Sequence, residues 1–202
     1  MLNKDIADRN SLVMISADPF YYENAEVGVI ERSWLDNAGI MFDAYYLIDY
    51  KIQKEDAGQL VQNASVIFLL GGYTVEQHDL LIKYQLSGFI KKSSAVVIGT
   101  SAGAKNMSFK WVCSKYKEHN KVSFVYDSTG MGLGLNHFSF EPHADFDNTE
   151  FIQGPLFHLS EETDIYLAGK NGAVRVKDGK IDIIGSVYLI SKSRIQKLDE
   201  TL

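Results

Sequence analysis

The chain has 202 residues, of which 46% are hydrophobic and 23% are charged, and its net charge at pH 7 is −6. This size and composition suit a single soluble α/β domain spanning residues 1–202, with room for a large core. The negative charge and the absence of a lysine and arginine cluster argue against a nucleic-acid surface, and no apolar run approaches membrane-spanning length.

The cysteine content and the first ten residues indicate which cysteine chemistry and which cellular location to expect. Cys113 is the only cysteine, so the chain forms no intramolecular disulfide and no thiolate metal cluster, and we expect a packed thiol. Residues 1–10 are polar and lack the apolar core of a signal peptide, which favours a cytoplasmic location.

The first half of the chain alternates short apolar runs with segments of helical periodicity. The apolar runs predict strands at 11–17, 41–48, 64–70 and 95–98. The helical spacing predicts helices at 21–38, 55–62 and 75–92. Because 64–70 and 95–98 are nearly all apolar, both strands are expected to be buried on both faces. The alternation predicts a mostly parallel sheet with helices on both sides, a three-layer sandwich.

The second half of the chain has shorter elements. We expect the helix that begins near Ala104 to end before Ser114, a glycine-rich loop at 128–136 and a helix at 148–159. Short strands are predicted at 122–126, 138–140, 164–167, 173–177, 180–184 and 187–191. Asp178-Gly179 is a strong hairpin signal between two of these strands.

Residues 95–107 carry the main chemical signal, with the sequence AVVIGTSAGAKNM. A buried strand runs into a turn of the form G-x-S-x-G and then into a helix, which is the context of a nucleophile elbow. Such a turn holds Ser101 in a strained backbone region, and small neighbours leave room for the substrate. The N–H of Ala102 can help to bind an oxyanion. The alternative interpretation is a glycine-rich turn whose serine has no chemical role.

A second backbone donor for the oxyanion is expected at the neighbouring strand. Gly71-Gly72 ends that strand, and residues without side chains let a carbonyl group come close. A tight strand-to-helix turn would need the same glycines, and both interpretations can hold together.

A serine nucleophile also needs a base within hydrogen-bond reach. His143 has the best setting, because it follows a proline and a short apolar strand and precedes the small Ala144. The other histidines are the near rival His137, the helical His78 and His158, and His119 in a charged segment. The carboxylate that orients the base has five candidates that spacing alone does not separate: Glu118, Asp127, Glu141, Asp145 and Asp147.

Three segments in the same order are similar to one family: LLGGYT, VVIGTSAGA and GLGLNHFSFEPH. They resemble the serine peptidases of the dipeptidase E and cyanophycinase family, and the resemblance runs from about Ser11 to the last strand. It implies a fold like that of class I glutamine amidotransferases, which is flavodoxin-like, with a serine replacing the cysteine at the elbow.

The resemblance also assigns roles. Ser101 matches the nucleophile and His143 the general base, while Gly72 and Ala102 match the oxyanion donors, with Gly71 beside them. The family's acid lies fifteen to eighteen residues after the nucleophile. Glu118 falls in that window and glutamate is the acid in the cyanophycinase branch, so Glu118 is the choice and Asp127 the reserve.

Two departures from the family pattern bear on the substrate. Tyr73 stands where the family usually has asparagine, and residues 128–131 look like an insertion. Dipeptidase E is selective for an N-terminal aspartyl residue and cyanophycinase for β-linked aspartyl-arginine, and no residue here decides between them.

We therefore expect a serine peptidase that cuts a peptide or isopeptide bond of a small substrate through an acyl-enzyme, with no metal and no organic cofactor. The alternatives are an esterase with the same triad and a catalytically silent relative that binds a ligand. A small peptide is the expected partner, and nucleic acid and membrane are not. Homodimers are common among small α/β enzymes, although no residue pattern specifies one here.

Overall fold

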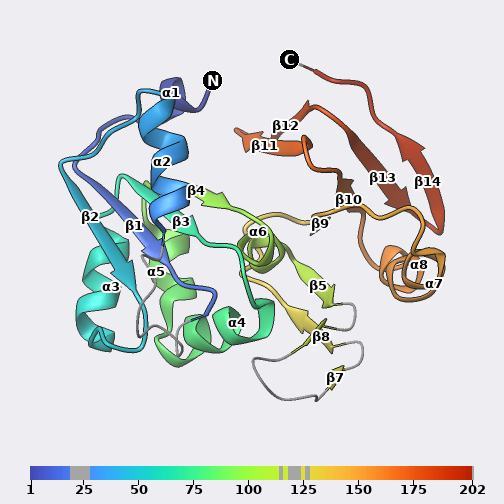
Figure 1. Ribbon diagram of the computed structural model, residues 1–202, viewed down its shortest axis with the longest axis horizontal. Helices are drawn as coiled ribbons and strands as arrows, with labels where there is room; N and C mark the ends of the chain where they lie inside the picture. The colour runs from blue at the N-terminus through green and yellow to red at the C-terminus, as the bar shows by residue number, and fades with distance from the viewer. Residues whose placement is uncertain (19–27, 114–115, 118–123, 126–127, 202) are drawn as a thin grey trace. The chain divides into compact units, whose positions relative to one another are not determined.

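The computed structural model describes residues 1–18, 28–113, 116–117, 124–125 and 128–201. The chain divides into two compact units, Met1–Asn106 and Met107–Leu202 (Figure 1). Their association into one functional domain stays a prediction. No helix among the described residues is long and apolar enough to cross a membrane.

The first unit contains a parallel sheet of four strands. These are β1 (Ser11–Ile15), β2 (Ala44–Ile48), β3 (Val66–Leu69) and β4 (Val96–Gly99). Their order is β2-β1-β3-β4, and each neighbouring pair is parallel. This is the order of a flavodoxin-like, doubly wound fold, so the predicted α/β class is confirmed.

Helices precede, connect and follow the strands of this sheet (Figure 1). They are α1 (Leu2–Asp5), α2 (Val29–Asn37), α3 (Lys54–Gln62), α4 (Thr74–Lys83), α5 (Leu86–Lys92) and α6 (Ala102–Met107). The chain steps from β1 to β2 in one direction and from β2 to β3 and β4 in the other. Because parallel crossovers are right-handed, this reversal puts α2 on one face and the α3–α5 helices on the opposite face. Residues 21–27 of the helix predicted at 21–38 lie outside the described residues.

Side-chain alternation along the strands builds a core on each face of the sheet. Leu12, Met14, Val66 and Phe68 form one cluster with Leu35 of α2. Their neighbours along β1 and β3 point to the opposite face and are also buried. Helices α3, α4 and α5, which lie on that face, each have buried residues. Helix α3 packs closely on α5, since a β-carbon on Gly58 of α3 would lie 2.9 Å from the ring of Phe89 of α5.

Two expectations for this unit are wrong. The helix predicted at 75–92 is two helices, α4 and α5, because Gln85 adopts a left-handed conformation with φ 55°. The hydroxyl of the buried Tyr84 donates to the carbonyl of Ile52, a tertiary contact that local periodicity does not report. Strand β4 is half-buried rather than fully buried, and in the described part of the chain it ends this sheet beside β3.

The second unit has a mixed sheet in the order β14-β13-β10-β9. Its strands are β9 (Ser139–Glu141), β10 (Ile165–Ala168), β13 (Val187–Ser191) and β14 (Arg194–Lys197). A helical segment packs on one face: α7 (Thr149–Phe151), a π turn (Ile152–Leu156) and α8 (Phe157–Ser160). The π turn contains Pro155, which has no N–H to donate to the usual carbonyl, so the helix widens there.

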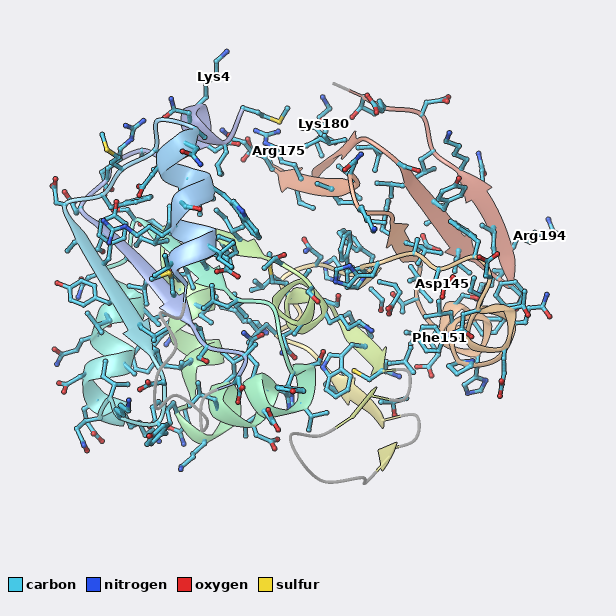
Figure 2. The ribbon with its side chains drawn as sticks, viewed as in Figure 1. Lys4, Asp145, Phe151, Arg175, Lys180 and Arg194 are labelled. Atoms are coloured by element: carbon cyan, nitrogen blue, oxygen red, sulfur yellow. The ribbon has the colours of Figure 1, made fainter. Side chains whose placement is uncertain are left out.

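The hairpin of β11 (Ala173–Lys177) and β12 (Lys180–Ile184) packs on the other face of this sheet. Its turn has φ 52° at Asp178 and 74° at Gly179, as the hairpin signal predicts. Arg175 and Lys180 extend from this hairpin (Figure 2). Both form ion pairs with Asp182, whose side chain is only 2% exposed.

Several short strands of this unit differ from the predictions. Residues 128–131 are strand β8 (Ser128–Met131), which pairs with β5 (Lys110–Cys113), so the loop expected over 128–136 begins with a strand. A β-carbon on Gly130 would lie 2.2 Å from the Trp111 ring, so this glycine makes room for the indole. Strand β14 and the pair β6 (Tyr116–Lys117) and β7 (Phe124–Val125) complete the described strands.

Candidate active site

Ser101 lies at the turn between β4 and α6. Its φ is 50°, a left-handed backbone that non-glycine residues adopt at a cost of about 1–2 kcal/mol, so the predicted strain is confirmed. The N–H of Thr100 donates to Leu69 O at 3.2 Å, and Gly103 N–H donates to Thr100 O at 2.9 Å. These bonds tie both sides of the turn to each other and to β3.

Gly103 is required by the close approach of α6 to β3. A β-carbon at this position would lie 2.0 Å from Leu69 O and 2.5 Å from the carbonyl carbon. No side chain fits that space, which explains the last glycine of the G-x-S-x-G pattern.

The Gly71-Gly72 turn lies beside Ser101, as the neighbouring-strand argument predicts. A β-carbon added to Gly71 would lie 3.3 Å from Ser101 Cβ. Gly72 has φ 141°, and a β-carbon there would lie 3.0 Å from that of Ala17. The next residue, Tyr73, is half-buried and its N–H donates to Ala17 O at 3.0 Å.

The backbone donors of this turn are available. Neither Gly71 nor Gly72 donates its N–H to any residue that the structure describes. Ala102 is the first residue of α6, where a helical N–H precedes the intrahelical ladder. The arrangement in this unit is thus a serine in a left-handed conformation with the Gly71 backbone beside it and the first residue of α6 directly after it.

His143 lies in the second unit, two residues beyond the end of β9. Its side chain is exposed, and its φ of 58° is again left-handed. The following N–H, of Ala144, donates to Ala168 O at 2.8 Å, which ties this loop to the end of the parallel neighbour β10.

Positive φ singles out few non-glycine residues of the described chain. Three lie in hairpin turns and one separates α4 from α5: Asp178, Lys192, Ser193 and Gln85. Ser101 and His143 are the other two. Strained backbone away from such turns is concentrated at functional sites.

The remaining candidates divide into described and undescribed residues. Glu118, Asp127 and His119 lie outside the described residues. Glu141 is buried at the end of β9, whereas Asp145 and Asp147 are exposed. His78 is half-buried in α4, and His137 and His158 are exposed. Cys113 is buried, as expected, and no group of three or more potential metal ligands occurs among the described residues.

A comparison with protein families matches residues 38–184 to peptidase family S51. The match covers well over half of the chain, including the Gly71-Gly72 turn, Ser101 and His143. The chain belongs to peptidase family S51. It is therefore a serine peptidase, and the predicted family is confirmed.

Solved structures agree with the S51 fold. A peptidase from an acI-B1 Actinobacterium is 19% identical with a TM-score of 0.69, and the match covers 100% of this chain and 86% of that one. A protein from Listeria monocytogenes EGD-e, provisionally named Peptidase E, is 15% identical with a TM-score of 0.60, covering 98% and 92% of the two chains. No curated protein matches the chain by sequence.

Two buried polar residues near the S51 elbow were missed by the sequence analysis. Gln77 of α4 and Asn106 of α6 are both 0% exposed and hydrogen-bond to each other. The available signal was the position of Gln77, three residues from Thr74 and from Leu80, on the helix face that is otherwise buried.

Proposed function

We propose that this S51 peptidase hydrolyses a peptide or isopeptide bond of a small peptide with Ser101 as nucleophile, His143 as base and Glu118 as the orienting acid. The observation that carries the proposal is the left-handed Ser101 with the Gly71 backbone against it. A serine held in this way exposes its hydroxyl beside peptide N–H groups that can receive negative charge.

In the first half of the reaction, Ser101 Oγ attacks the substrate carbonyl carbon while His143 accepts the hydroxyl proton. The resulting oxyanion accepts hydrogen bonds from the N–H groups of Gly72 and Ala102, with Gly71 beside them. The carbon–nitrogen bond then breaks, and the amine leaves with the proton from His143.

In the second half, water attacks the ester on Ser101 and gives its proton to His143. The acid product leaves and the proton returns to Ser101. Glu118 holds the imidazole in the tautomer that these transfers need, and Asp127 is the reserve for that role. These steps use no metal and no organic cofactor.

An aspartyl residue is the substrate feature that we propose first, either at an N-terminus or in a β-linked aspartyl-arginine. Tyr73, next to the Gly71-Gly72 turn, replaces the family's usual asparagine and is a candidate for altered preference. A cytoplasmic location and a homodimer stay predictions.

The test combines active-site labelling with a substrate panel. The wild type should react with a fluorophosphonate probe and cleave an aspartyl member of a panel holding aspartyl dipeptides, β-aspartyl-arginine, neutral dipeptides and a simple ester. Ser101→Ala should abolish labelling and turnover, and His143→Ala should lower kcat/KM by at least about 10³-fold. His158→Ala, an exposed histidine on α8, is the matched control and should retain activity.

The identity of the acid is tested by comparing kcat in Glu118→Gln and in Asp127→Asn. The loss of kcat should be larger in Glu118→Gln. Turnover of the ester alone would replace the peptidase proposal with an esterase. Labelling that survives in Ser101→Ala would remove Ser101 from the mechanism.

A further inference from the structure

The buried amide pair, Gln77 and Asn106, joins α6, the helix after Ser101, to the segment that holds the Gly71-Gly72 turn. Gln77 Nε2 donates to Ile15 O and to Leu70 O, each at 3.1 Å. Asn106 Nδ2 donates to Thr74 O and to Gln77 Oε1, each at 3.0 Å. The pair thus links the ends of β1 and β3, the start of α4 and the end of α6.

The orientations of both amides follow from their partners. Two carbonyl oxygens face one end of the Gln77 amide, so that end must be the nitrogen, which carries both donors. Its oxygen then faces Asn106, which must present its own nitrogen. Turning either amide over would place oxygen against oxygen in a fully buried site. All four amide hydrogens are therefore committed to acceptors.

The bond from Gln77 to Leu70 O fixes the peptide group that begins the turn. A trans peptide is planar, so the N–H of Gly71 points opposite to the Leu70 carbonyl. Holding that carbonyl inward directs the Gly71 N–H outward. A β-carbon on Gly71 would lie 3.3 Å from Ser101 Cβ, so this peptide borders the nucleophile. The N–H groups of Gly71 and Gly72 have no acceptor among the described residues.

We propose that Gln77 and Asn106 are positioning residues that set the Leu70–Gly71 peptide, and through it the Gly71-Gly72 turn that carries the proposed oxyanion donor Gly72, against the Ser101 elbow. The inference rests on the proposed function. Neither side chain touches the substrate, and both act through the backbone of the turn. Donors fixed before the reaction stabilise developing charge without reorganisation.

The experiment compares Gln77→Met, Asn106→Leu and the double variant with Leu81→Ala. Both single variants replace the amide with an apolar side chain of similar length and so remove its hydrogen bonds, whereas Leu81→Ala truncates a buried side chain of α4 that lies outside the Gly71-Gly72 turn. kcat and KM are measured well below each Tm, with fluorophosphonate titration counting the active sites. If Gln77→Met does not fold, Asn106→Leu carries the test.

We expect kcat to fall about 10- to 100-fold in each single variant with KM nearly unchanged, because the lost interaction matters mainly in the transition state. The double variant should lose little more than the worse single variant, since the two residues act as one unit. Equal losses of kcat in Leu81→Ala and Gln77→Met at matched stability would overturn the proposal.

A readout independent of turnover separates this inference from the proposed function. In protein labelled with ¹⁵N-glycine, the Gly71 and Gly72 amide resonances should shift in Gln77→Met and not in Leu81→Ala. Unchanged resonances in Gln77→Met would overturn the positioning of the turn. If these resonances shift in Gln77→Met but fluorophosphonate does not label the wild-type protein, the positioning of the turn is supported and the catalytic proposal is overturned.

Discussion

Gly103 shows how strictly a single position in the elbow is constrained. Its φ is not left-handed, so it is not needed for backbone freedom. It is needed because a β-carbon would lie 2.0 Å from Leu69 O. Ser101, two residues earlier, has the opposite requirement, since it keeps its side chain in a left-handed conformation. The motif thus combines one steric demand with one conformational demand.

Gly103→Ala should lower the free energy of unfolding by about 2–3 kcal/mol, because α6 must move away from β3 to admit the methyl group. The same movement displaces Ser101, so fluorophosphonate labelling should slow. Urea denaturation and labelling rates measure the two effects.

Gly88→Ala is the control for this substitution. Gly88 lies in α5 with nothing within 4 Å of an added β-carbon, so alanine should raise stability by about 0.5–1 kcal/mol. Equal destabilisation by the two substitutions would show that the approach of α6 to β3 is not the cause.

Among the elements, the β11–β12 hairpin carries a charge pair across its strands. Arg175 lies opposite Asp182 in the register, and Lys180 Nζ lies 3.1 Å from Asp182 Oδ1. Hydrogen bonds from Lys180 and Arg175 hold the pKa of Asp182 below its ordinary value of 3.8, against the opposing effect of burial. A carboxylate with a lowered pKa stabilises the fold above its ordinary pKa, and this contribution is lost as the pH falls through the lowered value.

Asp182→Asn should therefore lower Tm at pH 7, and the difference from wild type should shrink as the pH falls through the Asp182 pKa. Thermal unfolding across the acidic range measures the effect. Asp199→Asn, at an exposed position, is the control and should change Tm little at any pH. A Tm difference for Asp182→Asn that does not depend on pH would point to packing and not charge.

Element boundaries show what local patterns report and what they omit. The α2 helix ends at Asn37, close to the predicted end at residue 38, and Gly39 follows it with φ 73°, with bonds from Gly39 N to Asp36 O and from Ile40 N to Leu35 O. The break between α4 and α5 has no such signal, because Gln85 adopts its left-handed backbone without being a glycine. The β13–β14 turn, Lys192-Ser193, likewise lacks the usual hairpin residues although both have positive φ.

At the scale of the whole molecule, the charge balance makes a prediction about partners. Aspartate and glutamate number 26 against 20 lysines and arginines, and the pI is about 5.3. Net negative charge repels the phosphate backbone. We expect no retention on heparin at about 0.15 M salt and no change in the anisotropy of a labelled oligonucleotide. Salt-sensitive binding to either probe would contradict this.

The sequence by itself determined the parallel α/β class, the elbow at Ser101 and the family, because strand–turn–helix patterns and short motifs are local. It also placed Gly71-Gly72 near Ser101, since parallel strands end at one edge of a sheet. Only the tertiary structure decided that Gly103 must lack a side chain, that Tyr84 anchors a helix break and that Gln77 bonds to Asn106. Each of these depends on atoms brought together from distant parts of the chain, such as Leu69 O, Ile52 O and the carbonyls of Ile15 and Leu70. Periodicity records which face of an element is buried, whereas the structure records what that face meets.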